Sequence, residues 1–259
     1  MAIRAAHPRL SARKMYSMLQ PEGLDRDQFE AFCLSQGYRV SFRRAYHRTT
    51  NSYGVKRFPN LLLDKELTGV NQAWVGDITY YRIGEQFYYL TLLMDLWSRY
   101  LVGYGVSSRL LASQTSIRAL QMAFRGRGKP GGLILHSDGG GQYYSNEYLS
   151  LTAGTGILHS MGSSVYENGA AERLNGIIKS EYLSAYYPRN YGALQRCIAR
   201  AVRHYNERPH QCLGLMSPQA YEQLSPTEQK EKKKQKKKNT SNNNINMQSS
   251  VNSKTVNVF

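Results

Sequence analysis

The segment NQAWVGDITYYRIGEQFYYLTLLMDLWSRYLVGYGV, residues 71–106, decides the fold. It holds three runs rich in aromatic and β-branched residues, AWVGDITYY, FYYLTLLMD and YLVGYGV, with turn signals at Gly84-Glu85 and Trp97-Ser98 between them. Runs of this composition that are separated by tight turns are typical of β-strands that pair with their neighbours. The segment therefore predicts a three-stranded antiparallel meander.

After the meander, the pattern changes to alternating helices and strands. Apolar residues recur at helical spacing over 110–124, and the glycines of RGRGKPGG end that helix before a short buried strand, LILHS. A short helix near 146–152 and a strand at 157–160 follow. Two longer helices, 168–182 and 190–206, are expected next, each with an asparagine N-cap. This order predicts an α/β fold with a five-stranded mixed sheet flanked by helices.

Two short helices are expected near the start of the chain. Ser11 is a candidate N-cap for the first helix. After a turn at Gly23, Asp25 and Gln28 form the sequence pattern of a capping box for the second helix. The buried side of the second helix is expected to hold Phe29, Phe32 and Cys33. The pair predicts a small helical domain of the helix-turn-helix kind.

Basic residues follow these helices, with no acid between Gly37 and Leu63. The second helix begins with acidic residues, so we do not expect it to read bases in a DNA groove, and phosphate contacts fit the basic stretch better. A basic linker without a bound partner is an equally open reading. The candidate DNA-binding residues of this stretch are Arg43, Arg44 and Arg48. We divide the chain into a helix-turn-helix-like domain, a basic linker, a core and a Lys/Asn-rich tail, with the boundaries 1–50, 51–69, 70–224 and 225–259.

The chain is strongly basic, with a formal net charge of +16 and a pI of about 9.8, which favours a polyanionic partner. Residues 225–259 contain eight lysines and two acids, a charge of +6 that leaves +10 on residues 1–224. The body is therefore basic without its tail. The tail is of low complexity and nearly free of aromatic residues, so we expect it to be disordered and to contact DNA nonspecifically.

Several classes of protein are excluded by what the sequence lacks. No stretch approaches the roughly 18 apolar residues of a membrane span, and the first residues have no apolar signal core. The three cysteines, Cys33, Cys197 and Cys212, are widely spaced and include no CxxC pair, so they are interpreted as reduced thiols. These features predict a cytoplasmic protein that does not enter a membrane.

Three acidic residues stand where packing alone does not explain them. Asp77 interrupts a strand, Asp138 ends the LILHS strand, and Glu172 lies in the first turns of a long helix. If the two strands are neighbours, both aspartates project from one sheet edge and the helix can bring Glu172 to the same point. Carboxylate oxygens are the ligands that Mg²⁺ prefers, and two such ions offset three negative charges once a phosphate joins them. The sequence therefore predicts a site for two Mg²⁺ ions, for which Mn²⁺ can substitute.

The helix that carries Glu172 has two distinct faces. Its expected buried face consists of Ala171, Leu174, Ile177 and Ile178. Glu172, Asn175, Gly176 and Lys179 share the opposite face. The small side chains of this face leave room for a nucleic-acid strand, and Lys179 can hold a phosphate or a base near the metals. A solvated polar face is the alternative interpretation.

Other polar residues of the core receive structural interpretations. Asp95 is expected to be a turn carboxylate paired with Arg99 rather than a catalytic acid. His136 and His159 are expected to be core or hydrogen-bonding histidines. Arg208 lies in a segment expected to close the fold, and a DNA contact through it is left open.

Five motifs in this order resemble the catalytic core of bacterial insertion-sequence transposases, in particular the IS-three family. They are NQAWVGDITYY, MDLWSRYLVGY, HSDGGGQY, YENGAAERLNGIIKSE and YNERPHQCLG with SPQAY, and they span about residues 70–222. A weaker likeness to the N-terminal helix-turn-helix of that family covers roughly residues 1–50. The resemblance implies a ribonuclease-H-like integrase core whose DDE triad falls on Asp77, Asp138 and Glu172.

The resemblance also implies an activity and its partners. Such enzymes cut a strand at each end of a mobile element with metal-activated water and join the freed 3′-hydroxyl to a target DNA. The implied partners are the terminal inverted repeats and target DNA, with an oligomer assembled on DNA in the bacterial nucleoid and no small-molecule substrate. A DNA-contacting basic residue falls on Lys179, and Arg173 and Asn175 beside Glu172 are further candidate contacts. A noncatalytic DNA-binding protein derived from a transposase, and a structure-selective nuclease of the same fold, remain as alternatives.

Overall fold

A computed structural model describes residues 2–38, 40, 58–162 and 168–232 of the chain. Its centre is one sheet with the strand order β3-β2-β1-β4-β5, in which the first three strands pair antiparallel and β1, β4 and β5 pair parallel. The strands are β1 (Ala73–Ile83), β2 (Gln86–Asp95), β3 (Leu101–Ser107), β4 (Ile134–Ser137) and β5 (Leu158–Met161). The predicted meander and the predicted five-stranded mixed sheet are confirmed.

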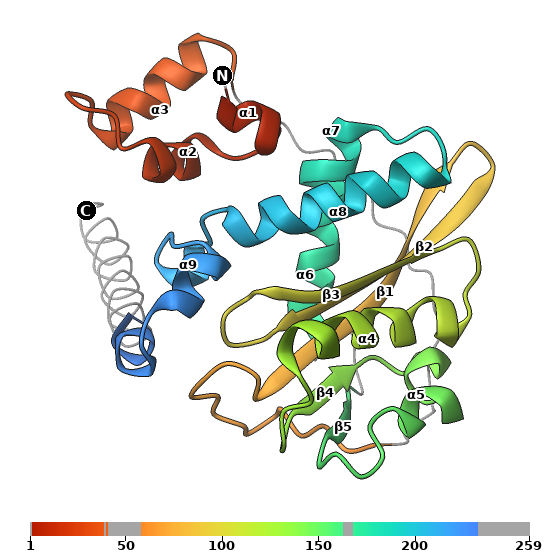
Figure 1. The fold of residues 1–259 in the computed structure, drawn as a ribbon. Coiled ribbons are helices and arrows are strands. Elements are labelled where there is room, and N and C mark those ends of the chain that lie inside the picture. The colour runs from red at the N-terminus through yellow and green to blue at the C-terminus, as the bar shows by residue number, and fades with distance from the viewer. Residues whose placement is uncertain (1, 39, 41–57, 163–167, 233–259) are drawn as a thin grey trace, which may run out of the picture.

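Helices cover both faces of this sheet (Figure 1). The helices of the core are α4 (Ser116–Arg127), α5 (Asn146–Ser150), α6 (Gly169–Ile177), α7 (Ser184–Tyr186), α8 (Tyr191–Glu207) and α9 (Pro218–Gln223). Short 3₁₀ turns lie at Ala112–Gln114, Gly141–Tyr143 and Gln211–Leu213. Neighbouring strand residues face opposite sides, so Val75 packs with α6 and α8 whereas Trp74 packs in the cluster that includes α4 and α5. The two hydrophobic cores thus share one sheet.

The long helix after residue 168 differs from the expected single α-helix. A π-helical segment, Ile178–Leu183, separates α6 from α7. Asn168, the expected N-cap, makes no capping hydrogen bond; its side-chain amide donates to the carbonyl of Gly76 in β1 over 3.1 Å. Asn190 does cap α8, because its side chain accepts from the backbone N–H of Ala193 at 2.8 Å. The prediction that Asn168 caps the helix was therefore wrong, since its side chain bonds to a distant strand instead of to the helix backbone.

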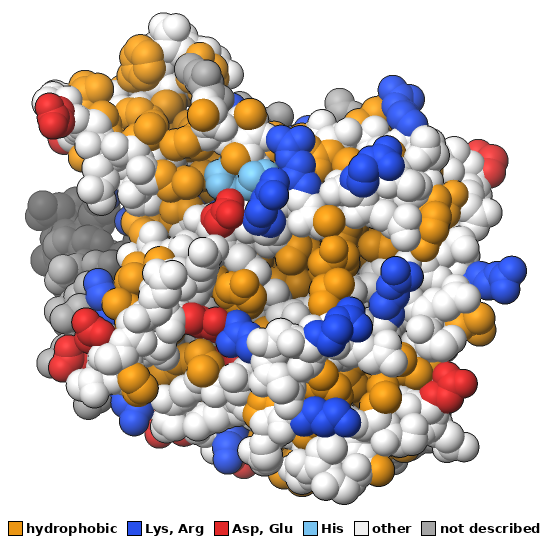
Figure 2. All heavy atoms as spheres, viewed as in Figure 1, with side chains coloured by type: hydrophobic (Ala, Val, Ile, Leu, Met, Phe, Trp, Pro, Cys, Tyr) orange, Lys and Arg blue, Asp and Glu red, His pale blue; other side chains and the backbone are white. Residues whose placement is uncertain are grey.

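The N-terminal helical domain consists of α1 (Ala2–Ala6), α2 (Ala12–Leu19) and α3 (Arg26–Ser35). The capping box at Asp25 and Gln28 is confirmed. The inward placement of Phe32 is wrong, since its side chain is 50% exposed while Phe29 and Cys33 are buried. His7 lies at the junction with the core, where its Nδ1 is 3.2 Å from the hydroxyl of Tyr182. The histidine side chains in Figure 2 mark this junction.

Part of the expected linker packs on the core. The ring of Phe58 packs in a tilted arrangement against those of Tyr144 and His159, and the backbone N–H of Leu61 donates to Ser160 Oγ at 2.9 Å. The chain is therefore attached to the β5 side of the sheet from residue 58 onward. The candidate DNA-binding residues Arg43, Arg44 and Arg48 lie outside the described residues.

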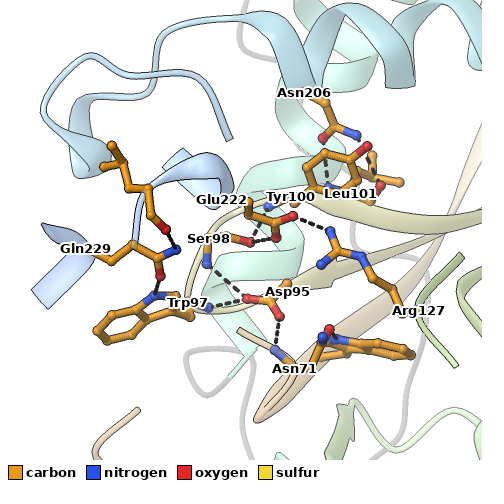
Figure 3. A network of polar contacts seen from close by, with 12 residues as sticks. Asn71, Asp95, Trp97, Ser98, Tyr100, Leu101, Arg127, Asn206, Glu222 and Gln229 are labelled. Atoms are coloured by element: carbon orange, nitrogen blue, oxygen red, sulfur yellow. Dashed lines mark hydrogen bonds and ion pairs between the residues drawn. The ribbon is translucent and has the colours of Figure 1, made fainter. Parts of the chain in front are cut away.

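Asp95 is a fully buried structural residue at the end of β2. Its carboxylate accepts the backbone N–H groups of Asn71, Trp97 and Ser98 at 2.6 to 2.9 Å, as Figure 3 shows. Among the described residues it forms no ion pair with Arg99, so the expected pairing was wrong, although the turn role was right. Backbone donors satisfy this charge in place of a cation.

The same region holds the beginning of the expected disordered tail. Residues 226–232 are helical, and Gln229 is buried with its side-chain oxygen accepting from Trp97 Nε1 at 2.7 Å. The hydroxyl of Tyr221 donates to the Gln229 carbonyl at 2.8 Å. Glu222 of α9 bonds to Ser98 and pairs with Arg127 (Figure 3). The expectation of disorder was therefore wrong for residues 225–232, and residues 233–259 lie outside the described part.

None of the helices described in these ranges is both long enough and apolar enough to cross a membrane.

Candidate active site

Two strands bring Asp77 and Asp138 to one edge of the sheet. β1 and β4 are parallel neighbours, and Val75 pairs with His136, so each aspartate comes two residues after that pair. Side chains two residues apart on a strand share a face, so both carboxylates extend beyond the last paired residues on the same side. The prediction that these two strands are neighbours is confirmed.

Glu172 comes from the first turn of α6, which packs on the same face of the sheet. Ala171 and Leu174 are each 1% exposed and fix the helix against the core, whereas Glu172 itself is exposed. The bond from Asn168 to the Gly76 carbonyl fastens the start of α6 to β1, one residue before Asp77. The helix start and the strand are thus held together close to the acids.

The three carboxyl groups influence one another electrostatically. Burial raises the pKa of Asp77 to about 7, and the charges of Asp138 and Glu172 add to the rise. Burial also raises the pKa values of Asp138 and Glu172, and for Glu172 the charge of Asp138 contributes. Hydrogen bonds from the Ile78 N–H and the Asn175 side chain act in the opposite direction on Asp77. The site therefore brings three acidic groups together without an ion pair to a basic side chain of the described residues.

The carboxylates are not arranged as a closed metal cage. Within the ranges that the structure describes, no group of three or more His, Cys, Asp or Glu side chains is placed to hold a metal ion. Glu172 is exposed, whereas the two aspartates are partly buried. The backbone elements converge as predicted, whereas the side-chain oxygens do not meet at one point.

Asn175 is buried, contrary to its expected place on the open face of the helix. Its side-chain amide donates to Asp77 Oδ2 at 2.7 Å, so it supports the carboxylate and is not open to a DNA strand. Lys179 is partly buried beside it, with Nζ donating to Thr79 Oγ1 at 3.1 Å and lying over the ring of Tyr80. Burial lowers the pKa of Lys179, and the charge of Asp77 acts against that decrease. Arg173 is exposed next to Glu172.

Arg208 is buried and therefore cannot contact DNA in this structure. Its side chain is 1% exposed, and Nη2 donates to Glu181 Oε1 at 3.1 Å while Nη1 lies 2.6 Å from Oε2. Both predicted histidine roles hold, since His136 bonds to Ser160 and His159 to Thr152. The buried ion pair was not predicted, because the two residues are 27 positions apart.

Sequence reasoning also missed the residues that pack around Asp77 and Asp138. Tyr143 is buried against Gly76, and a methyl group at Gly76 would lie 3.3 Å from its hydroxyl. A methyl group at Gly140 would lie 3.0 Å from Asp138 Oδ1. The glycine-rich HSDGGGQY motif was the available signal, because glycine next to an acid indicates close approach of other atoms.

The raised pKa of Asp77 predicts how pH affects stability. Its folded pKa of about 7 exceeds its ordinary value of 3.8, so the folded state holds a proton that the unfolded state releases between these values. The contribution of Asp77 to stability is therefore fully present at low pH and is lost as pH rises toward 7. The shift sets a ceiling of about 4 kcal/mol on this loss.

Thermal unfolding of metal-free protein should show this dependence. Between about pH 5 and about pH 8 we expect the Tm of the wild type to fall more than that of Asp77→Asn, which has no proton to release. Scans in a chelator measure both. Parallel pH profiles for the two proteins would contradict the assignment of a raised pKa to Asp77.

Comparisons with known proteins identify the family. Two models described as "Integrase core domain" match residues 68–165 and 154–218. The chain is 33% identical over 193 residues to Transposase InsF for insertion sequence IS3A of Escherichia coli, covering 72% of this chain and 67% of that transposase. It is 32% identical over 233 residues to the uncharacterized 31 kDa protein of insertion element IS600 of Shigella sonnei, covering 85% of each chain.

A solved structure supports the fold. A chain of the simian T-cell lymphotropic virus intasome superposes with a TM-score of 0.53 at 19% identity, covering 83% of this chain and 75% of that chain. The sheet order, the flanking helices and this likeness confirm the predicted ribonuclease-H-like integrase core. With the identities to the insertion-sequence proteins, these findings show that the chain belongs to the IS3 family of DNA transposases, whose core is an integrase core domain.

Proposed function

We propose that this transposase cuts DNA at the ends of its element and joins the freed 3′ ends to a target, using divalent metal ions held by Asp77, Asp138 and Glu172. One observation carries the proposal: β1, the end of β4 and the start of α6 bring three acids to one edge of the sheet, where the charges of Asp138 and Glu172 add to the raised pKa of Asp77 and the charge of Asp138 to that of Glu172. None of the three forms an ion pair with a Lys or Arg of the described residues.

The donor set fits hard divalent cations. All three candidate ligands are carboxylates, which Mg²⁺ and Mn²⁺ bind through oxygen, and the unneutralised negative charge favours cations. Burial around Asp77 strengthens this attraction, since charges interact more strongly away from water. We propose two Mg²⁺ ions at this site, for which Mn²⁺ can substitute. When bound, they would activate the attacking oxygen and stabilise the leaving oxygen of the phosphodiester.

The surrounding residues have separate proposed roles. Asn175 holds Asp77 in place through its amide, and Asn168 fastens the start of α6 to β1. Lys179, on the same side of the sheet as Asp77, supplies a positive charge for the DNA backbone beside the acids. Exposed Arg173 is a second candidate phosphate contact. Arg43, Arg44 and Arg48 remain proposed contacts from outside the described residues.

The proposed partners are DNA duplexes. They are the terminal inverted repeats of the element and the target DNA, bound by an oligomer that assembles on them. Figure 2 shows Lys and Arg side chains spread over the face formed by α4 and α8, with few acidic side chains among them. Such a charge distribution attracts DNA from a distance and is weakened by salt.

The test is an assay on duplexes that carry the terminal repeat of the element. With Mg²⁺, the full chain should release 3′ ends and join them to a second duplex, and EDTA should stop both steps while DNA binding continues. Cleavage that persists in EDTA would contradict the metal site. Binding without any cleavage would favour the noncatalytic alternative, and cleavage without joining would favour a nuclease of the same fold.

A further inference from the structure

Tyr143 has a buried hydroxyl that forms no hydrogen bond within the described residues. The residue is 3% exposed, and its hydroxyl bonds to no atom in the described part of the chain. Such a group costs folding free energy unless something else satisfies it. Neighbouring Tyr144 is different, because its hydroxyl donates to the Asp138 carbonyl at 2.6 Å. The orphan hydroxyl of Tyr143 therefore calls for a functional explanation.

The position of the ring points to the acid site. Tyr143 follows Asp138 in the 3₁₀ turn Gly141–Tyr143, and its backbone N–H donates to the Gly140 carbonyl at 3.0 Å. Its hydroxyl reaches Gly76, the residue before Asp77, where only the missing side chain of glycine leaves room. Pairing between β1 and β4 ends at Val75, so the hydroxyl lies where the two strands no longer bond to each other.

The electrostatic neighbours of the hydroxyl agree with this placement. Burial raises the pKa of Tyr143, and the charges of Asp77 and Asp138 add to the rise. The hydroxyl therefore stays protonated in the working pH range and can donate one hydrogen bond without adding charge. A neutral donor next to two carboxylates can orient them without competing with a cation for the site.

We propose that Tyr143 is a positioning residue whose hydroxyl donates a hydrogen bond to the Asp77–Asp138 carboxylate pair when the pair binds a divalent cation. This inference rests on the proposed function. It explains why a buried hydroxyl is kept beside two glycines at a position where phenylalanine would satisfy the packing. Tyr143 packs in the core cluster on the opposite face of the sheet to α6, so a bond from its hydroxyl would support the pair from a different side than Asn175 does.

The experiment compares the wild type with Tyr143→Phe by two measurements. Titration with Mn²⁺ gives the metal Kd, and thermal unfolding in a chelator gives the stability without metal. We expect Tyr143→Phe to raise the Kd about tenfold or more. Its Tm in a chelator should be equal to or above that of the wild type, because an unsatisfied buried hydroxyl has been removed. A purely packing role predicts no change in Kd.

Tyr148→Phe is the matched control. Tyr148 is buried, its ring lies 5.7 Å from that of Tyr143, and neither aspartate affects its pKa. This variant loses the same atom and should keep the wild-type Kd. An unchanged Kd in Tyr143→Phe, or a lowered Tm in the chelator, would overturn the inference.

Glu172→Gln separates this inference from the proposed function. A wild type whose Mn²⁺ site weakens in Glu172→Gln supports the function, whatever Tyr143→Phe does. A wild type without a carboxylate-dependent Mn²⁺ site would overturn both.

Discussion

Glu172→Gln should reduce both end cleavage and strand transfer by about 10³-fold or more, because losing one of three carboxylate ligands removes several kcal/mol of charge stabilisation from the transition state. The change keeps the size and shape of the side chain. Glu172 is exposed and forms no ion pair with another described side chain, so its loss should not unfold the protein. The measurement is product yield on duplexes with the terminal repeat, with Tm as the check on folding.

Asp77→Asn and Asp138→Asn should give losses of the same size, since the three residues act as one unit. The double variant Asp77→Asn with Glu172→Gln should therefore be hardly worse than either single variant. Glu147→Gln is the matched control, because Glu147 is an exposed acid of α5 outside the candidate site and its loss should leave the yield unchanged. Strand transfer that survives in Glu172→Gln would remove that residue from the catalytic role.

Glu181→Ala should destabilise the protein by about 3–5 kcal/mol, because it leaves the Arg208 guanidinium buried without its counter-ion. The Arg208 side chain is 1% exposed, so the fold holds its charge away from bulk water. The pair joins the π-helical segment after α6 to the chain that follows α8, so its loss should loosen the helix that carries Glu172. Urea unfolding of metal-free protein measures the change in the free energy of unfolding.

Two further variants test whether the expected loss of stability comes from the burial of the Arg208–Glu181 pair. Glu85→Ala breaks the exposed Arg82–Glu85 pair and should cost less than about 1 kcal/mol. Glu181→Leu combined with Arg208→Met replaces the buried pair by apolar side chains of similar size and should recover most of the loss. A loss in Glu181→Ala as small as that in Glu85→Ala would show that the pair does not stabilise the fold.

Local physics determined the main elements of this protein. The strand runs of residues 71–106, the capping box of Asp25 and the cap of Asn190 depend on residues close in sequence, and the sequence predicted all three. The candidate acids were proposed for a related reason: Asp77 lies in the middle of a strand against its own propensity, which indicates a role other than packing.

Only the tertiary structure decided which distant groups meet. Asn168 would be expected to cap its own helix in isolation, but its side-chain amide donates a hydrogen bond to the Gly76 carbonyl of β1. Asn175 is polar and was expected on the open face of the helix, yet it is buried and its side-chain amide donates a hydrogen bond to Asp77. Gln229 was assigned to a disordered tail, yet Trp97 holds it in a buried contact. In each case a polar group was satisfied by a partner at least 90 positions away, which helical or strand periodicity cannot anticipate.

The sequence by itself predicted most of the helices, the sheet and three candidate acids, because periodicity, capping and a charge in an apolar strand are properties of a few neighbouring residues. The tertiary structure decided how those acids are supported and how far their charges interact. Burial and the pairing of buried polar groups depend on contacts between elements that are remote in the chain, so the raised pKa of Asp77 and the position of the Tyr143 hydroxyl emerge only once the sheet and α6 have packed.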